Sequence, residues 1–395
     1  MSEMSYLEKL LDGVEVEWKT LGSIAELKRG TSITKKDVID GTIPVVAGGR
    51  TPAYYHNTSN RDGQTIVIAG SGAYAGFVSW WEEPIFVSDA FTVKPHNILL
   101  PRYCYHFLMN MQQQLHEFKS GGGVPHVYPR DVSPILIPIP CPDNPEKSLA
   151  IQSEIVRILD KFTVLTAELT AELNMRKKQY NYYRDQLLSF DESSVEWKTL
   201  LEACDYVDYR GKTPKKTQSG IFLVTAKNIR MGYIDYHASQ EFISEEDYAI
   251  VMRRGLPKKG DVLITTEAPC GFVAQVNREN IALAQRVIKY RSKNTQLSNS
   301  FLKHYLLGSQ FQDKLMQAAT GSTVKGIKGS RLHQLKIPIP SKVEQDRIVA
   351  ILDKFDTLTN SITEGLPREI ELRQKQYEYY RDLLFSFPTP ETVSN

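Results

Sequence analysis

The clearest hydrophobic pattern in the chain is an apolar stripe that alternates every three and four residues and occurs twice. The first stripe comprises Ile155, Ile158, Phe162, Leu165 and Leu169, and the second comprises Ile348, Ile351, Phe355, Leu358 and Ile362. This spacing places the apolar side chains on one face of a helix, in the a/d pattern of a coiled coil. We therefore predict a central spacer helix within 151–194 and a C-terminal spacer helix with a tail within 342–395.

Two arrangements of these stripes are open. The stripes can pack against each other as a seam between the two helices, or each can pack only on its own domain. Gly365 and Pro367 lie within the second helical segment. Because proline removes an internal hydrogen bond, we expect the second helix to kink or restart there.

The regions between these segments have the pattern of mixed α and β structure. Short apolar runs predict strands at 65–69, 91–93, 261–265 and 286–290. Helical stretches are predicted around 103–118 and 301–319, ended by Gly121 and Gly321. The order of the strands in a sheet does not follow from this pattern.

Four sequence motifs occur twice, which reveals an internal repeat. VEWKTL stands at 16–21 and 195–200, IPIP at 137–140 and 337–340, and ILDKF at 158–162 and 351–355. The fourth motif, QYNYYRDQLLSF at 179–190, returns as QYEYYRDLLFSF at 376–387. The alternating prolines predict an extended connector at the end of each half. Between the motifs the two halves differ widely, so a duplicated framework carries two unlike domains.

We therefore predict an α+β fold with a pseudo-twofold internal repeat. Two recognition domains, 21–150 and 195–341, are separated by the two spacer helices. Residues 1–20 form an N-terminal helical segment that completes the repeat, because YLEKLL at 6–11 resembles the helix end at 183–188. The start of the chain is then expected to pack where the C-terminal helix finishes.

Composition narrows the class of protein. The hydrophobic and charged fractions, 41% and 24%, are those of a soluble globular protein. No apolar run is long enough to span a membrane and the N-terminus lacks a signal-peptide pattern, so we expect no membrane partner and a cytoplasmic location. The four cysteines are far apart, which favours reduced thiols over a zinc site. A net charge of only +2 means that any DNA-binding cations must be concentrated locally.

Basic residues cluster near the start of each predicted domain. The candidates are Lys28, Arg29, Lys35 and Lys36 in the first domain, and Arg210, Lys212, Lys215 and Lys216 in the second. Cations beside glycine and threonine suit contacts with DNA phosphates. The alternative is a solvated basic turn.

Further candidates lie in loops that follow predicted strands. Ser71 and Tyr74 belong to the small-residue loop GSGAYAG, which can approach a DNA groove or form a tight hairpin turn. Other side chains have the donors and acceptors that read base edges: Thr266, Glu267, Gln285 and Arg286. Loops at 120–126 and 320–328 occupy the same place in the two halves, and Lys325 in the second is expected near phosphate.

No pattern of a catalytic centre stands in the sequence. The glycine spacings at 255–260 and 321–326 lack the Lys-Ser/Thr of a phosphate loop, and the eight histidines form no metal-binding pair. We expect no catalytic residue, no metal site and no bound cofactor in this chain. The rival hypotheses are an enzyme in its own right and a purely structural coiled-coil scaffold; the scaffold explains the helices but not the two divergent domains.

Over nearly its full length the chain resembles the specificity subunit of type I restriction-modification systems, on the strength of the four repeated motifs. The resemblance implies that each recognition domain reads one half of an interrupted double-stranded DNA site and that the helices form an antiparallel coiled-coil spacer. It also implies two modification subunits, which use S-adenosylmethionine to methylate adenine, and restriction subunits that use ATP and Mg²⁺. The tandem TAEL at 166–173 resembles a short repeat whose copy number sets the gap between half-sites in one subgroup.

Overall fold

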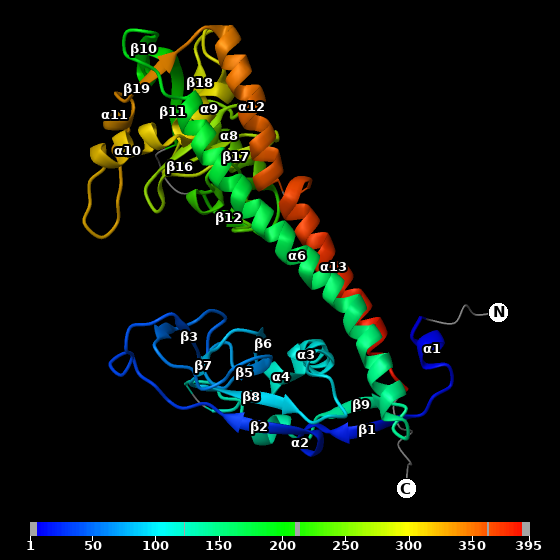
Figure 1. Cartoon of the computed structure of the whole chain (residues 1–395). Helices are drawn as coiled ribbons and strands as arrows, with labels where there is room; N and C mark the ends of the chain where they lie inside the picture. Colours follow the sequence, from blue (N-terminus) through cyan, green and yellow to red (C-terminus); the bar gives the residue numbers. More distant parts are fainter. Residues whose placement is uncertain (1–5, 122, 210–213, 362, 389–395) are drawn as a thin grey trace, which may run out of the picture. The chain divides into compact units, whose positions relative to one another are not determined.

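The computed structural model describes residues 6–121, 123–209, 214–361 and 363–388, which fall into two compact units. Unit 1 comprises Met1–Ala167 with Glu371–Asn395, and unit 2 comprises Glu168–Ile370. Each unit contains a mixed α/β domain and parts of the long helices (Figure 1). The first unit thus combines both ends of the chain, whereas the second is continuous in sequence.

The repeated motifs that open and close each half pair with each other. In unit 1, β1 (Val16–Thr20) pairs antiparallel with β9 (Leu136–Pro140), with Trp18 opposite Pro138. In unit 2, β10 (Glu196–Thr199) pairs in the same way with β19 (Lys336–Ile339). The predicted extended connectors are therefore strands. The helical prediction for 1–20 is wrong at 16–20, because VEWKT alternates apolar and polar residues with the period of a strand.

Each domain is built on a four-stranded antiparallel sheet with the same strand order. In unit 1 the order is β2 (Ala25–Arg29), β8 (Ala90–Pro95), β5 (Thr65–Ala69), β6 (Val78–Trp81). In unit 2 it is β11 (Cys204–Asp208), β18 (Val287–Ser292), β15 (Val262–Thr266), β16 (Cys270–Gln275). The four strands predicted from the sequence correspond to β5, β8, β15 and β18. The shared order confirms that the divergent regions have a common framework.

Smaller sheets distinguish the two domains. Unit 1 adds β3 (Ile43–Val46), β4 (Tyr54–His56) and β7 (Phe86–Val87). Unit 2 adds β12 (Lys216–Thr217), β13 (Ile221–Val224), β14 (Phe242–Ile243), β17 (Ile281–Leu283) and the helix α8 (Glu245–Val251). The sequence difference between the halves is therefore expressed in these outer elements.

Two helices follow the sheet in each domain, where one helical stretch was predicted. They are α3 (Pro101–Asn110) and α4 (Gln112–Glu117) in unit 1, and α9 (Asn299–Leu307) and α10 (Ser309–Ala318) in unit 2. Between α9 and α10, Gly308 has extended backbone angles (φ −68°, ψ 150°), which ends the first helix and caps the next. The short helices α2 (Leu21–Ile24), α5 (Pro129–Val132), α7 (Leu200–Ala203) and α11 (Gly329–Leu332) complete the two domains.

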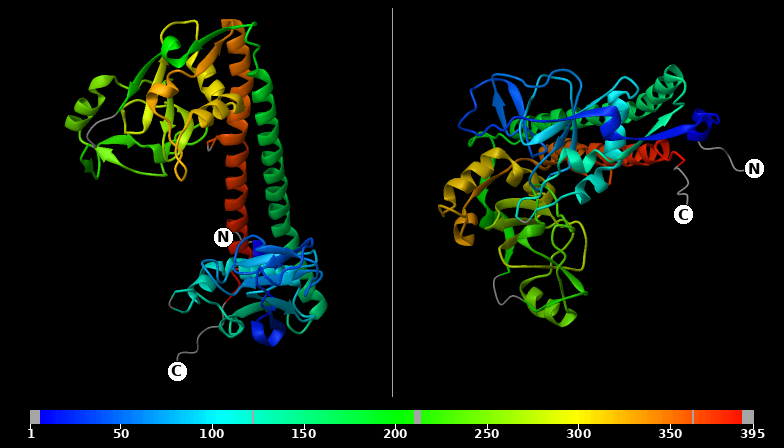
Figure 2. Two further views of the ribbon diagram at one scale, coloured as in Figure 1. Left: turned by 90° about the vertical axis from the view of Figure 1, so that its left-hand side faces the viewer. Right: turned by 90° about the horizontal axis from the view of Figure 1, so that it is seen from below.

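The long helices are α6 (Pro145–Leu187), α12 (Lys342–Asn360) and α13 (Gly365–Leu384), seen from two further sides in Figure 2. The predicted restart at Gly365 is confirmed: its φ of +80° suits glycine, and a Cβ there would lie 2.4 Å from the Thr357 carbonyl oxygen. Within the described residues, none of the helices combines the length and apolar character needed to cross a bilayer.

In each unit one long helix begins in the domain core and another ends there. The core of unit 1 contains Ile155 and Leu159 near the start of α6, together with Leu384 at the end of α13. The core of unit 2 contains Ile348 and Leu352 near the start of α12, together with Tyr180 near the end of α6. The paired helix segments therefore run in opposite directions within each unit.

The apolar stripes pack partly on their own domains and partly on aromatic side chains of another long-helix segment. Ile155 and Ile348 are fully buried in the domain cores, whereas the next residues of each stripe are half-buried. Phe162 stacks on Tyr380 with ring centroids 5.2 Å apart, and Phe355 stacks on Tyr180 and Tyr183 at 5.9 and 5.8 Å.

The expectation that the two stripes face each other is thus wrong at their phenylalanines, which pack on the repeated tyrosine motif instead. A helical period shows which side chains share a face but not which partner that face meets. Ile362 lies outside the described residues.

The two ends of the chain meet in unit 1, as the sequence predicted. Leu7 and Leu11 of α1 (Tyr6–Leu11) share a hydrophobic core with Leu384, Phe385 and Phe387. The indole Nε1 of Trp18 donates a 2.8 Å hydrogen bond to the Pro388 carbonyl oxygen. The N-terminal segment and the end of the C-terminal helix therefore pack together within unit 1, which completes the internal repeat.

Candidate nucleic-acid interface

A pocket of about 560 Å³ opens at one end of the sheet in unit 2, where strands β11, β15 and β18 meet the loop 320–328. It is lined by all four residues predicted to read base edges, Thr266, Glu267, Gln285 and Arg286. The Arg286 guanidinium lies 3.4 Å from the Glu267 carboxylate, and both side chains are about half exposed. The strand register thus gathers residues that lie in two separate segments of the sequence.

The loop at 320–328 is held in place by backbone hydrogen bonds. Thr320 and Gly326 exchange two N–H to O bonds of 2.8 and 2.9 Å, and Gly326 also forms a bridge to Glu267. Gly321 has a φ of +110°, and a Cβ there would lie 2.1 Å from the Val324 carbonyl oxygen, so the turn requires glycine. Lys325 is exposed on this loop, between two residues that line the pocket.

A second pocket, of about 340 Å³, occupies the same place in unit 1. Its lining includes Arg29 at the end of β2, Ser71 after β5, Asp89 before β8, and His126. The loop 120–126 closes in the same way as its counterpart, since Ser120 and His126 exchange hydrogen bonds of 3.0 and 2.9 Å and Ser71 bridges to His126. Two unlike sequences therefore build the same kind of pocket.

The other predicted residues of unit 1 lie outside the pocket lining. Tyr74 is 42% exposed, and the Arg50 guanidinium lies 4.9 Å from its ring centroid. Lys28 is exposed on β2, and Lys35 and Lys36 are exposed in the turn that follows it. The sequence prediction named these residues together with Ser71 and Arg29, but the structure brings only the last two into one pocket.

The basic residues near the start of unit 2 are also separate from its main pocket. Lys216 forms a 2.9 Å ion pair with Glu241 and lines a smaller neighbouring pocket that shares Gln285 and Arg286 with the main one. Lys215 is exposed. Arg210 and Lys212 lie outside the described residues.

Sequence reasoning missed two acidic residues of the pockets, Asp89 and Asp208. Asp208 ends β11 in unit 2, at the sheet edge where Arg29 ends β2 in unit 1. Asp89 directly precedes β8, as Arg286 directly precedes β18. For Asp89, the position of an ionisable residue immediately before a strand was the signal available in the sequence.

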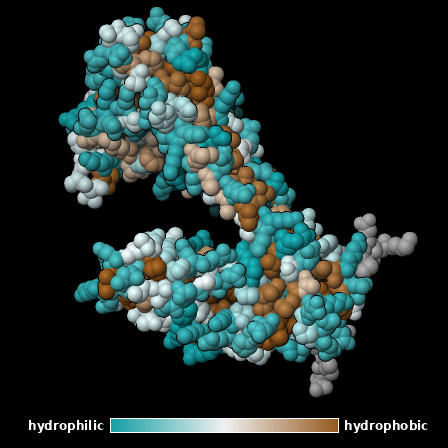
Figure 3. Space-filling view, viewed as in Figure 1, coloured by the Kyte–Doolittle hydropathy of each residue, from teal (hydrophilic) through white to brown (hydrophobic). Residues whose placement is uncertain are grey.

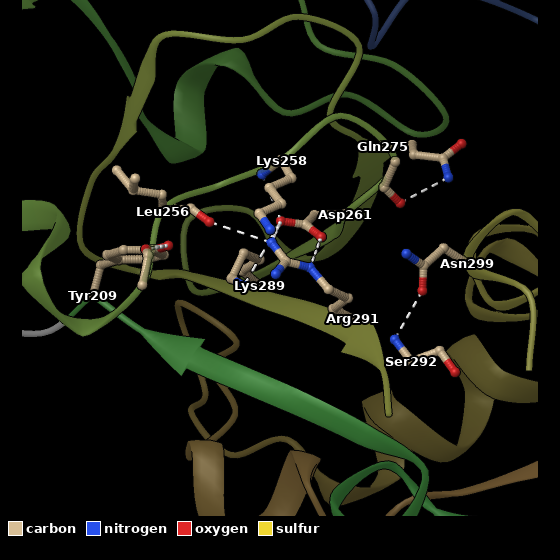
Figure 4. Close-up of polar contacts among 11 residues, drawn as sticks. Tyr209, Leu256, Lys258, Asp261, Gln275, Lys289, Arg291, Ser292 and Asn299 are labelled. Atoms are coloured by element: carbon tan, nitrogen blue, oxygen red, sulfur yellow. Dashed lines mark hydrogen bonds and ion pairs between the residues drawn. The ribbon is translucent and has the colours of Figure 1, made fainter. Parts of the chain in front are cut away.

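A buried ion cluster braces the sheet of unit 2 (Figure 4). Asp261, 1% exposed, accepts hydrogen bonds of 2.6 and 2.7 Å from the Arg291 guanidinium and lies 3.7 Å from the Lys289 ammonium. Burial lowers the pKa of Lys289, and Asp261 opposes that shift. Lys289 and Arg291 belong to β18, the strand that starts directly after Arg286, so the cluster fixes the strand that carries a pocket residue.

A buried histidine ties each domain to its long helices. In unit 1 the two ring nitrogens of His106 lie 2.7 Å from Asp160 and 2.9 Å from the Tyr377 hydroxyl. In unit 2 the Nε2 atom of His304 lies 2.7 Å from Asp353. Burial lowers the pKa of both histidines, against the opposing effect of their carboxylate partners. The aspartates are the third residues of the two ILDKF motifs, which explains why this polar residue recurs in both copies.

Metal ligands do not gather in the described part of the chain, where no group of three or more histidine, cysteine, aspartate or glutamate side chains is placed to hold an ion. The four cysteines are free, and three of them are buried. Burial raises the pKa of Cys204 to about 12, so this thiol stays protonated.

Comparison with known proteins identifies close relatives. The chain is 44% identical, over the whole of both chains, to the specificity subunit of the type I restriction enzyme EcoR124I/EcoR124II of Escherichia coli. It is 35% identical to the specificity subunit of the Escherichia coli type I restriction enzyme EcoprrI, over 92% of this chain and 93% of the relative.

Solved structures share the fold. The type I restriction-modification S subunit of M. genitalium matches with a TM-score of 0.61 and 18% identity, over 98% of this chain and all of the other. A structure that describes complex assembly and conformational transition of a type I restriction-modification system matches with a TM-score of 0.55 and 17% identity, over 94% and 97%. A family model described as the type I restriction modification DNA specificity domain matches residues 13–176 and 197–372. The chain therefore belongs to the specificity subunits of type I restriction-modification systems.

Proposed function

We propose that the two units read the two halves of an interrupted double-stranded DNA sequence, one half each, through the pockets at the ends of their sheets. As a specificity subunit, the chain provides DNA sequence recognition and is not the catalytic component of its system. The observation that carries the two-part reading is the pair of pockets, built at the same place on the same framework from different residues. Two sheets of the same strand order that carry different pocket residues suit a two-part DNA sequence with unlike halves.

The pocket residues have the chemistry of DNA contacts. Arg29 and Arg286 are guanidinium groups of the kind that bind guanine or phosphate, and Thr266, Gln285 and Ser71 provide neutral donors and acceptors for base edges. Exposed lysines outside the two pocket linings suit contacts with DNA phosphates. They are Lys28, Lys35, Lys36, Lys215 and Lys325. This local placement explains how a chain with nearly balanced charge can bind DNA.

The long helices offer two equivalent docking surfaces for the modification subunits. Tyr182 and Tyr379 stand three residues after the first glutamine of the two QYxYYRD copies, and they are 62% and 64% exposed. On the face drawn in Figure 3 both units are mainly hydrophilic, but hydrophobic surface lies over parts of the long helices. Exposed aromatic side chains are enriched at protein interfaces. The repetition of the surface supports two modification subunits per chain, with restriction subunits joining the same assembly.

The chemistry of the assembly belongs to those partners. S-adenosylmethionine is assigned to the modification subunits, and ATP and Mg²⁺ to the restriction subunits; this chain binds none of them. Its place of action is the cytoplasm, where it meets the DNA of the cell.

The TAEL repeat at 166–173 lies within the continuous helix α6 and is proposed to set the gap between the half-sites. Four more helical residues lengthen a helix by about 6 Å, comparable with one to two base pairs at about 3.4 Å each. Four residues are also close to one helical turn, so an inserted repeat rotates the following face by only about 40°.

Methylome sequencing tests the proposed function. A host that expresses this chain with its modification gene is compared with a host that expresses the modification gene alone. A new adenine-methylated motif in two parts, present only with this chain, is expected. A motif without a gap, or no new motif although both proteins are soluble and associated, would refute the two-part reading.

Co-purification tests the docking surfaces. Tyr182→Ser and Tyr379→Ser together are expected to release the modification subunit, whereas Tyr55→Ser, at a tyrosine that is 55% exposed on a strand of unit 1, leaves it bound. Unchanged co-purification of the double variant would reject these tyrosines as the contact.

A further inference from the structure

The two pockets can be superposed residue by residue through their backbone hydrogen bonds. The Gly70 amide donates to the Asp89 carbonyl oxygen in unit 1, and the Thr266 amide donates to the Arg286 carbonyl oxygen in unit 2, both at 2.9 Å. The residue after Gly70 is Ser71 and the residue after Thr266 is Glu267. These bonds make Asp89 equivalent to Arg286, and Ser71 equivalent to Glu267.

The strand register extends this equivalence to the sheet edge. Arg29 on β2 stands opposite Phe91, two residues after Asp89. Asp208 on β11 stands opposite Ile288, two residues after Arg286. Arg29 and Asp208 therefore occupy the same position of the framework. Because Asp89 and Arg286 share the other position, the cation and the anion have changed places between the two pockets.

The position of Arg286 beside Glu267 in unit 2 is not explained by a contribution to the stability of the fold. An ion pair between two half-exposed side chains, such as Arg286 with Glu267, stabilises a fold little. Arg286 also has a φ of +69°, a backbone conformation that costs a non-glycine residue free energy and that glycine would adopt without strain. An arginine held at this position by a carboxylate therefore points to a use for its guanidinium.

The arginine of unit 1 is also held in place. The Arg29 guanidinium lies 5.4 Å from the centroid of the Tyr128 ring, which stacks on His126, another residue of the pocket. A cation over an aromatic face is attracted by the ring and loses mobility. Each pocket thus contains one oriented guanidinium and, at the exchanged position, one carboxylate.

On the basis of the proposed function, we propose that each pocket reads a G·C base pair in the major groove, in opposite orientations within the two domain frameworks. The guanidinium of Arg29 or Arg286 donates to guanine O6 and N7, and the carboxylate of Asp89 or Asp208 accepts from the cytosine N4 amino group. Glu267 orients Arg286. The guanine then lies on the β2 side of the pocket in unit 1 and on the β18 side in unit 2.

The test uses the complex of this chain with its modification subunit, after the methylome has given the wild-type motif. Competition binding is measured between duplexes that carry the motif and duplexes in which one base pair is changed. In the Arg286→Ala complex, discrimination at a single G·C pair of one half-site is expected to fall roughly 5- to 150-fold, the range of one bidentate arginine contact. Arg29→Ala is expected to do the same in the other half-site.

Two further variants keep the test decisive. Arg253→Ala removes an exposed arginine outside the pocket and is expected to leave discrimination unchanged at every position. The triple variant Asp208→Arg, Glu267→Ser, Arg286→Asp gives unit 2 the charge arrangement of unit 1. Its preferred base pair at that position is expected to reverse from G·C to C·G.

The contrary results are distinct. The inference is overturned if Arg286→Ala, folded as judged by circular dichroism, weakens binding equally to all duplexes, because the arginine is then a phosphate contact. It is also overturned if discrimination is lost at an A·T pair. If Arg286→Ala fails to fold, Arg286→Lys replaces it, and full discrimination by this variant overturns the bidentate contact. Absence of a wild-type motif would refute the proposed function, and the assignment that rests on it would fall with it, whereas the other contrary results overturn the assignment alone.

Discussion

The two recognition domains of this chain share the strand order of their main sheet but differ in the charged residues that the sheet carries. Both use the same four-strand order and close their pockets with loops at equivalent places. In unit 2 a buried carboxylate, Asp261, holds two cations of β18. In unit 1 the positions equivalent to Asp261, Lys289 and Arg291 are Thr65, Thr92 and Lys94, so the buried carboxylate is replaced by a threonine. The Thr92 hydroxyl accepts a 3.1 Å hydrogen bond from Arg61. Backbone pairing thus specifies the frame, while side-chain polarity is free to vary on it.

The largest expected effect comes from replacing the second recognition domain by a copy of the first. Thr20 is opposite Leu136 and Thr199 is opposite Lys336, so residues 200–336 can be replaced by residues 21–136 at equivalent strand ends. The resulting chain is expected to direct methylation to a two-part site whose halves contain the same bases. Methylome sequencing is the measurement. A site that keeps the original second half would show that specificity lies outside the exchanged segment.

Removal of the buried charge in unit 2 is expected to cost stability there alone. Asp261→Asn leaves Lys289 and Arg291 without their carboxylate and should destabilise unit 2 by about 3–5 kcal/mol. The matched variant Thr65→Val in unit 1 removes a neutral hydrogen bond and should cost about 1 kcal/mol. Hydrogen exchange of peptides from β15, β18, β5 and β8 separates the two effects. If the two variants reduce the stability of their units equally, the buried carboxylate contributes no more to unit 2 than the neutral hydrogen bond contributes to unit 1, which would contradict the prediction.

The helix contacts should also be unequal. Phe355 stacks on two tyrosine rings and Phe162 on one, so Phe355→Leu is expected to cost about 1–2 kcal/mol and Phe162→Leu less. Chemical denaturation of the two single variants gives the free energies of unfolding. The stacking account fails if Phe162→Leu is the more damaging substitution.

Acidification should weaken both domains through their buried histidines. Burial holds the folded-state pKa of His106 and His304 below the value of an unfolded histidine, so the unfolded chain takes up protons first as the pH falls. Stability present at about pH 7.5 is therefore lost as the pH falls below about 6.5 toward the folded-state pKa.

Thermal unfolding between about pH 7.5 and pH 5.5 measures this loss. A His106→Asn, His304→Asn variant should show a flatter pH profile than the wild type. The single variants sharpen the comparison, because the Nδ1 atom of His304 has no hydrogen-bond partner among the described residues, whereas both ring nitrogens of His106 have one. His106→Asn is therefore expected to lower the melting temperature more, and the reverse order would contradict the geometry.

The parts of this fold that repeat were predictable from the sequence. Motifs that recur in the same order revealed the duplicated frame. The three- and four-residue spacing identified the long helices, and Gly365 with Pro367 identified the break in the second one. The partner of each stripe was not predictable, because periodicity defines a face and not its neighbour. Phe162 and Phe355 therefore meet tyrosines that the sequence places far from them.

The pocket residues were predictable only in part. Thr266, Glu267, Gln285 and Arg286 stand beside predicted strands, and their side chains suggested base contacts before their proximity was known. The exchange of Arg29 with Asp208 depends on strand register, which no local pattern encodes. The sequence placed Lys35, Lys36 and Tyr74 in the same loops as residues of the unit 1 pocket, but the structure places them outside the pocket lining. The backbone geometry of a loop decides where its side chains lie, and the sequence pattern does not give that geometry.

The closure of the repeat within unit 1 also bears on the order in which the protein folds as it is synthesised. Unit 2 is continuous in the sequence, so all of its residues are synthesised before the last part of unit 1. The core of unit 1 still lacks Leu384, Phe385 and Phe387 at that point. The domain translated first must therefore wait with an open hydrophobic face until the final residues emerge, and during that interval it is the part of the nascent chain most exposed to aggregation.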